Sequence, residues 1–295
     1  MNKVKTWVGV DWSVVPKRRA AWLADLERGT LSPYAEQPHD FETLLNWVDS
    51  LPKPAVIMID AGIGVTHEMA GVNGWESRHS NFADVLREGL LDFSFMDPVS
   101  RLQEWTPHHP FIHLPAGQGS FSALKKKAEG TLFRSFEPAL GAKPVFILSG
   151  IPGCVGGSSR NLWLSLQGLF KNREISLWPF DGSFNECLEK NEIVVCEAYP
   201  KIAFQIACAA DFPIPLKSSR KRDERWRRNQ LAHFIGTPFW RGTDLYLQDL
   251  EQACSSEDSF DALMLVLAAL RMNNHLPEAC PSPWEGAIFG QHLIS

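Results

Sequence analysis

Three apolar stretches of the chain each end on an acidic side chain. TWVGVD ends on Asp11, AVIMID ends on Asp60 and IVVCE ends on Glu197. Burying an unpaired carboxylate is costly, so a buried strand that stops at one needs a partner for that charge. Taken singly, Asp11 and Asp60 could be turn residues that follow a strand. Glu197 could instead cap the next helix or pair with an arginine.

Two further acids lie at the start of the apolar segment DSFDALMLVLAAL near the end of the chain. Its apolar residues recur at helical spacing and form a face that can pack on a sheet. Asp261 lies one step around the helix from that face, so its carboxylate could reach the sheet edge. The alternatives are an N-cap role for Asp258 and a favourable interaction of Asp261 with the helix dipole.

Converging carboxylates repel one another, and a hard divalent cation with oxygen ligands relieves that repulsion. Two such ions about 4 Å apart can clamp the attacking and leaving oxygens of a phosphoryl transfer. We therefore expect a site for Mg²⁺ or Mn²⁺. Its expected catalytic acids and metal ligands are Asp11, Asp60, Glu197 and Asp261, with Asp258 as a further metal ligand.

These acids require strands and helices that bring them to one edge. The pattern predicts a strand at 6–10 and a hairpin of strands at 20–26 and 31–35 around Gly29, which makes three successive antiparallel strands. Continuous apolar runs predict two more strands, at 55–60 and 193–197. Helical spacing and capping residues predict helices at 41–48, 81–88, 158–170, 200–208, 223–235, 244–254 and 260–272.

The expected fold class is therefore α/β, as one domain over residues 1–295. It has a five-stranded mixed sheet flanked by helices, with the first three strands antiparallel. Residues 61–192 form a long insertion between the fourth and fifth strands. A length of 295 residues with 44% hydrophobic and 21% charged residues fits such a domain.

The order of three strand-end acids and a final helix acid resembles the ribonuclease H-like superfamily. DSFDAL is similar to the D-x-x-D-A-L signature of RuvC-type resolvases. VGVDWS, VIMIDAGIG, SGIPGCVGG, CEAYP, FDALMLVLAAL and PWEGAIFG together resemble the domain of unknown function 429 family, described as predicted nucleases. The resemblance implies a ribonuclease H-like fold and an acidic site at Asp11, Asp60, Glu197 and Asp261. The family has I-D-A-P where this chain has Gly62 in the place of the proline.

A basic segment, KSSRKRDERWRRNQLAHF at 217–234, follows the third acidic strand. Such a segment can bind phosphates of nucleic acid, whereas the formal net charge of −5 provides no overall attraction. The alternative is a solvated helix whose basic side chains pair with Asp223 and Glu224. The expected nucleic-acid-binding residues are Arg220, Lys221, Arg222, Arg225 and Arg228.

The expected function is metal-dependent phosphodiester hydrolysis, with DNA or RNA as substrate. One alternative is a catalytically inactive ribonuclease H-fold binding or scaffold protein. Another is a nucleotide-binding phosphotransfer protein of the actin-like ATPase type, in which the Gly-rich turn at 150–157 would cradle a phosphate. Asp11 is followed by Trp-Ser-Val-Val-Pro rather than by a Gly-rich loop, which argues against that type.

Cysteine spacing and hydropathy bear on the cellular compartment. The six cysteines lie far apart without a C-x-x-C pair, which indicates neither a zinc site nor a disulfide framework. The first residues lack the apolar run of a signal peptide, and LMLVLAAL is too short to cross a bilayer. We expect a cytoplasmic protein.

Overall fold

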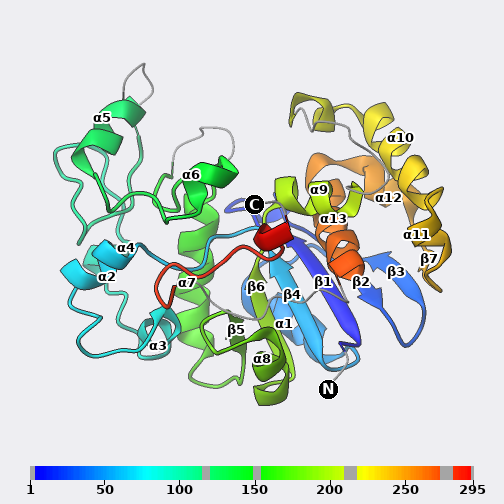
Figure 1. The fold of residues 1–295 in the computed structure, drawn as a ribbon, viewed down its shortest axis with the longest axis horizontal. Coiled ribbons are helices and arrows are strands. Elements are labelled where there is room, and N and C mark those ends of the chain that lie inside the picture. Colours follow the sequence, from blue (N-terminus) through cyan, green and yellow to red (C-terminus); the bar gives the residue numbers. More distant parts are fainter. Residues whose placement is uncertain (1–3, 115–119, 149–153, 209–217, 273–281, 294–295) are drawn as a thin grey trace.

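The structure is a computed structural model that describes residues 4–114, 120–148, 154–208, 218–272 and 282–293. It is an α/β structure with one mixed sheet between helices (Figure 1). Gly150 and Gly153 of the Gly-rich turn and Lys217 of the basic segment lie outside the described residues. The strands are β1 (Thr6–Asp11), β2 (Ala20–Asp25), β3 (Thr30–Pro33), β4 (Ala55–Ile59), β5 (Ser176–Trp178), β6 (Ile193–Glu197) and β7 (Tyr246–Leu247).

The sheet has the strand order β5-β6-β4-β1-β2-β3-β7. β2 is antiparallel to β1 and to β3, as the sequence predicted, whereas β4 is parallel to β1 and β6 is parallel to β4. The prediction of five strands was wrong, because β5 and β7 extend the sheet to seven. These edge strands contain three and two residues, too few to produce an alternating pattern in the sequence.

The helices lie on both sides of the sheet and in an outer lobe. The α-helices are α1 (Phe41–Asp49), α2 (His67–Val72), α3 (Phe82–Arg87), α4 (Phe93–Met96), α5 (Ser120–Lys127), α6 (Glu137–Leu140), α7 (Gly156–Leu169), α8 (Phe184–Lys190), α9 (Pro200–Cys208), α10 (Glu224–Ile235), α11 (Pro238–Arg241), α12 (Leu250–Ser255) and α13 (Glu257–Met272). The short 3₁₀ helices among the described residues are η1 (Pro16–Arg18), η2 (Ser218–Arg222) and η3 (Gln291–Leu293). No helix among the described residues is long and apolar enough to cross a membrane.

Capping explains where several helices begin. Asp40 accepts a hydrogen bond from the Thr43 N–H and starts α1, as predicted. The predicted helix at 244–254 is wrong in its first half, because β7 occupies that part and Asp249 caps α12. A polar stretch with one strong cap does not show how far upstream of the cap the helix extends.

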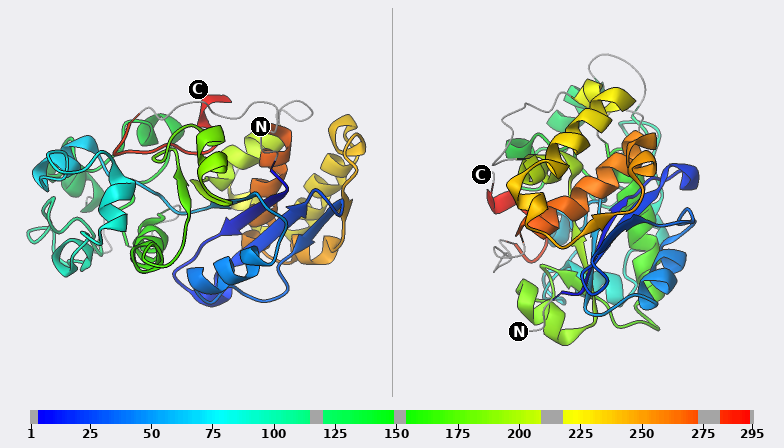
Figure 2. Two further views of the ribbon diagram at one scale, coloured as in Figure 1. Left: turned by 90° about the horizontal axis from the view of Figure 1, so that it is seen from below. Right: turned by 90° about the vertical axis from the view of Figure 1, so that its right-hand side faces the viewer.

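The sheet is covered on both faces, which is why its central strands are continuously apolar. Trp7 and Val56 belong to the core on the side of α9 and α13. Val8, Val10 and Ile57 belong to the core on the side of α1 and α7. The right-hand view in Figure 2 shows the sheet between these two helical layers.

Gly9 allows the final helix to lie directly on the first strand. A Cβ atom at Gly9 would lie 2.2 Å from the backbone oxygen of Ala262 in α13. Any other residue would therefore force the helix away from β1. This close approach fixes the position of Asp261, the neighbour of Ala262, relative to Asp11 at the end of β1.

The expected insertion, residues 61–192, contains helices α2 to α8 and strand β5. Its later part is integrated with the sheet, since β5 pairs with β6 and α7 packs against α1. Its earlier part, α2 to α6, forms the outer lobe beyond α7 (Figure 1). The lobe contains a small core of its own, which includes Trp105, Ile112 and Leu124.

Candidate functional site

Two of the predicted acids lie at the same end of adjacent parallel strands. Asp11 is the last residue of β1 and Asp60 follows β4, whose residues pair with β1 in parallel. The Asp60 N–H donates to the Val10 carbonyl oxygen at 2.9 Å, so the ladder continues up to this carboxylate. Asp261 comes from the first turns of α13, which lies on β1 at Gly9.

The electrostatics show that Asp11, Asp60 and Asp261 interact. Burial raises the pKa of Asp11 well above its usual value, and the charges of Asp60 and Asp261 raise it further. Burial also raises the pKa of Asp60 to about 8, with contributions from the charges of Asp261 and Glu197. The pKa of Asp261 is raised as well, mainly by burial. These three carboxyl groups form the acidic site.

A lysine ammonium group already lies within the acidic site. Lys221 Nζ donates to Asp261 Oδ1 at 2.5 Å and to Asp261 Oδ2 at 2.8 Å, and both residues are buried. Its positive charge lowers the pKa of Asp11, Asp60 and Asp261 and so opposes the effect of burial. Lys221, predicted to contact phosphate from a surface helix, is instead the cation of this site.

The backbone around Lys221 is held by a second buried basic residue. Arg227 donates from Nε and Nη2 to the Cys254 carbonyl oxygen at 2.9 and 2.7 Å, and it also donates to the Lys221 carbonyl oxygen. Cys254 lies in α12, so Arg227 ties η2 to that helix. By holding the main chain of Lys221, Arg227 helps to position its ammonium group.

Asp258 lies at the edge of the acidic site. It is half-buried, and its charge contributes to the raised pKa of Asp11. The alternative of an N-cap role is wrong, because Ser256 Oγ accepts the hydrogen bond from the Ser259 N–H at 2.9 Å. Asp258 also lines a cavity of about 280 Å³ together with Lys17 and Arg18.

Glu197 lies at the same sheet edge but is paired with an arginine. Arg134 donates from Nη1 to Glu197 Oε2 and from Nη2 to Glu197 Oε1, both at 2.6 Å. The Ile63 N–H donates to Glu197 Oε2 at 2.7 Å. Both oxygens are therefore occupied, and Glu197 takes the arginine-paired alternative that the sequence left open rather than that of an open metal ligand.

Arg134 is a site residue that sequence reasoning missed. It is buried, and it also donates to Glu137 Oε1 at 2.9 Å and to the Ile63 carbonyl oxygen at 3.1 Å. Burial raises the pKa of Glu137 to about 7, against the lowering effect of Arg134. Arg134 lies in the middle of the long expected insertion, where no motif marks it. The only signal was the open alternative that Glu197 pairs with an arginine, and that alternative did not identify which arginine.

Gly62 lies at a position that needs a backbone N–H and has no room for a Cβ atom. Its N–H donates to Ser159 Oγ at 2.8 Å, and a Cβ atom there would lie 2.3 Å from Val145 Cγ1. A proline has no N–H to donate and could not replace this contact. Ser159, expected as a possible cap of the helix at 158–170, lies inside α7 and holds the loop after Asp60.

The predicted nucleic-acid-binding residues divide into three groups. Lys221 is buried in the acidic site. Arg228 pairs with Glu224 and Glu251, which is the internally paired alternative. The exposed members are Arg220, Arg222 and Arg225. Asp223 accepts from the Arg225 N–H and caps α10.

The donor set has the chemistry of a site for a hard cation, but it is not assembled as one. Carboxylate oxygens are the ligands that Mg²⁺ and Mn²⁺ take. Within the described ranges, no group of three or more His, Cys, Asp or Glu side chains could hold a metal ion as placed. Lys221 supplies the positive charge instead.

Comparison with known proteins adds no relative. No family model matches the chain, and searches of curated proteins and of solved structures found no match either. The function must therefore be argued from the site.

Proposed function

We propose that the protein is a metal-dependent hydrolase of phosphodiester bonds in nucleic acid, and that Asp11, Asp60 and Asp261 form its reaction centre. The observation that carries the proposal is that two adjacent parallel strands end on Asp11 and Asp60 at the edge where α13 presents Asp261, so that the charges of Asp60 and Asp261 raise the pKa of Asp11. Such crowding is unfavourable without a cation, and perturbed carboxyl groups of this kind cluster at functional sites.

The strand arrangement supports the ribonuclease H-like architecture, which we also propose. Five adjacent strands, β6, β4, β1, β2 and β3, include three successive antiparallel strands followed in sequence by two strands parallel to the first. This is the arrangement that the resemblance implies. β5 and β7 extend it at the two edges.

We propose that Asp11, Asp60 and Asp261 hold Mg²⁺ or Mn²⁺, with Asp258 at the margin. A bound divalent ion would supply charge stabilisation for the phosphoryl oxygens and a more acidic water. Lys221 must release Asp261 before that carboxylate can accept a metal ion. Glu197 stays with Arg134 and positions the Asp60 loop through the Ile63 N–H.

Other residues of the chain have defined tasks in this proposal. Lys221, once released, would donate to a phosphate oxygen of the substrate. Tyr199 lies close enough to Asp60 and Asp261 for their charges, after burial, to raise the pKa of its phenol. The phenol therefore keeps its proton at neutral pH and can donate a hydrogen bond to the substrate.

A binding protein without catalysis is the second candidate. The observation that favours it is the Lys221–Asp261 pair, which neutralises the charge of Asp261 without any metal. Uptake of Mn²⁺ distinguishes the two candidates, because a site that is satisfied by its own lysine has no need of a second cation.

We further propose a cytoplasmic location for the protein. The cysteines Cys154, Cys187, Cys196 and Cys254 are free thiols, which is the usual state in a reducing compartment.

Cleavage of labelled oligonucleotides tests the proposed function. Single-stranded DNA, duplex DNA, branched DNA and RNA are incubated with the protein in Mn²⁺, in Mg²⁺ and in EDTA. We expect metal-dependent cleavage that Asp11→Asn and Asp261→Asn abolish while the circular dichroism spectrum is unchanged. Asp244→Asn, an exposed acid away from the site, is the matched control and keeps full activity. Full activity of Asp11→Asn or Asp261→Asn contradicts the proposal.

A further inference from the structure

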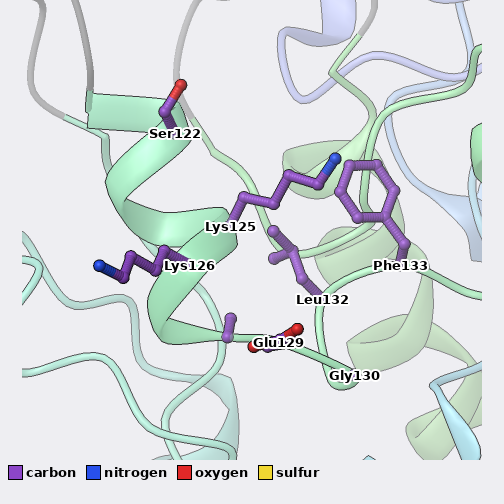
Figure 3. A pocket seen from close by; sticks show the side chains of 8 residues that line it. Ser122, Lys125, Lys126, Glu129, Gly130, Leu132 and Phe133 are labelled. Atoms are coloured by element: carbon purple, nitrogen blue, oxygen red, sulfur yellow. The ribbon is translucent and has the colours of Figure 1, made fainter.

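The outer lobe contains a pocket of about 480 Å³ between α5 and the turn that follows it. Figure 3 shows Lys125 pointing toward the ring of Phe133, whereas Lys126 points away from that ring. Lys125 Nζ lies 5.7 Å from the centroid of the Phe133 ring. Glu129 is the acidic residue of the lining. The pocket therefore combines an aromatic face with an ammonium group.

A second lysine connects this pocket with the acidic site. Lys143 lines a small cavity together with Asp60 and Tyr199, next to the acidic site. Its Nζ lies 5.2 Å from the centroid of the Phe121 ring. Phe121 packs edge-to-face on Phe133, with ring centroids 6.2 Å apart. Contacts thus run without a break from the cavity beside Asp60 to the pocket on α5.

We call Lys143, Phe121, Phe133 and Lys125 the basic aromatic track. Both rings are half-buried and pack on the small core of the lobe, which keeps them in place while part of each ring remains accessible. Lys127, the last residue of α5, donates to the carbonyl oxygens of Leu102 and Gln103 and holds the helix on the lobe. The track is therefore a fixed surface with a lysine at each end and two adjacent aromatic rings between the lysines.

We propose that the basic aromatic track binds single-stranded nucleic acid and leads it to the acidic site. Grooves that bind single strands combine positive charge along the backbone with aromatic rings on which bases stack. A duplex hides its base faces, so it cannot use the rings. An ammonium group over a ring at an accessible position is held weakly, by about 0.5–1 kcal/mol. Lys125 and Lys143 can therefore turn from the rings to phosphates while a base stacks on Phe133.

The choice of nucleic acid as ligand rests on the proposed function. The following test measures binding by the track separately from cleavage at the acidic site. Binding of a fluorescent single-stranded oligonucleotide is measured by anisotropy in EDTA, where no metal-dependent cleavage occurs. We expect Lys125→Gln/Lys143→Gln to weaken binding and to lower the slope of log K against log salt by about 1.4, from two phosphate contacts. The control Lys5→Gln/Lys171→Gln removes two exposed lysines elsewhere and leaves the slope unchanged.

The ring is tested with a substitution that preserves apolar packing. We expect Phe133→Leu to weaken binding about tenfold through loss of stacking, and Phe133→Trp to retain it. If the double lysine variant keeps the wild-type affinity and salt slope, the track does not bind the nucleic acid. The absence of binding by the wild-type protein also overturns the proposal. Equal binding of a duplex, with the same losses in the variants, overturns the preference for single strands. If these variants lose binding but the wild type shows no Mn²⁺-dependent cleavage, the track binds nucleic acid and the proposed nuclease activity is refuted.

Discussion

Lys221 and Asp261 form a buried ion pair in which one ammonium group reaches both carboxylate oxygens, at 2.5 and 2.8 Å. The pair joins η2, in the basic segment, to the first turns of α13. It neutralises part of the charge that Asp11, Asp60 and Asp261 bring together. A metal ion and Lys221 therefore compete for the same carboxylate, and the following predictions depend on that competition.

Replacing Lys221 with glutamine separates the two effects of this pair. Without metal, Lys221→Gln leaves Asp261 buried without its partner, and loss of one partner of a buried pair costs about 3–5 kcal/mol. We expect a lower Tm than wild type in EDTA and a larger rise in Tm on adding Mn²⁺. Thermal unfolding measures both, with the exposed neighbour in Arg222→Gln as the control. A variant with the wild-type response to Mn²⁺ would show that Lys221 does not compete with the metal.

Asp60 makes the stability of the metal-free protein depend on pH. Burial raises its pKa to about 8, so the folded state binds a proton that the unfolded chain loses near pH 4. The stability that this proton contributes is complete at low pH and is lost as the pH rises through about 8. We expect Asp60→Asn to have a Tm several degrees above wild type at pH 8 in EDTA and a smaller difference at pH 5. Asp244→Asn should show neither effect, and an Asp60→Asn difference that shrinks with rising pH contradicts the assignment.

Arg134 holds Glu197 and Glu137 in the same buried place. Arg134→Met removes the guanidinium group from both buried carboxyl groups, and we expect a loss of about 3–5 kcal/mol in the free energy of unfolding. Arg134→Met/Glu197→Gln should recover part of it, because it removes one of the unpaired charges. Urea unfolding of the two single variants and the double variant gives the coupling energy. Additive losses would mean that the two side chains do not act as a pair.

Gly9 positions Asp261 without any chemistry of its own. Gly9→Ala places a methyl group against the Ala262 backbone oxygen, which cannot move without moving α13. We expect lower stability and also weaker Mn²⁺ binding, because Asp261 moves away from Asp11. The control is Gly168→Ala in α7, where a Cβ atom meets nothing within 4 Å. If Gly9→Ala binds Mn²⁺ with wild-type affinity, metal binding does not depend on the close packing of α13 on β1.

Much of the sheet could be predicted because its signals are local. The runs that end at Asp11, Asp60 and Glu197 are continuously apolar, and they became three adjacent parallel strands. The edge strand β7, in contrast, contains two residues and depends on pairing with β3, a partner more than 200 residues earlier in the chain. No window of sequence around Tyr246 contains that information.

The acids of the site could be anticipated, but their partners could not. Asp11, Asp60 and Asp261 follow from strand ends and helix spacing, which are short-range features. Arg134 and Lys221 lie 63 and 40 residues from the acids that they bind. Their roles depend on the way the outer lobe and η2 fold back onto the sheet edge. The sequence around a basic residue in a loop or a basic segment does not indicate which acid it will pair with.

Calorimetric titration of the metal-free protein with Mn²⁺ tests the shared acidic site most directly. We expect saturable binding with release of protons, detected as a dependence of the heat on the ionisation enthalpy of the buffer, because the carboxyl groups of Asp11 and Asp60 give up protons as the metal binds. Asp60→Asn and Asp261→Asn should abolish the binding, and Asp244→Asn should leave it intact. If the wild-type protein takes up no Mn²⁺, or if Asp60→Asn and Asp261→Asn bind it as tightly as wild type, the three carboxyl groups do not form a metal site.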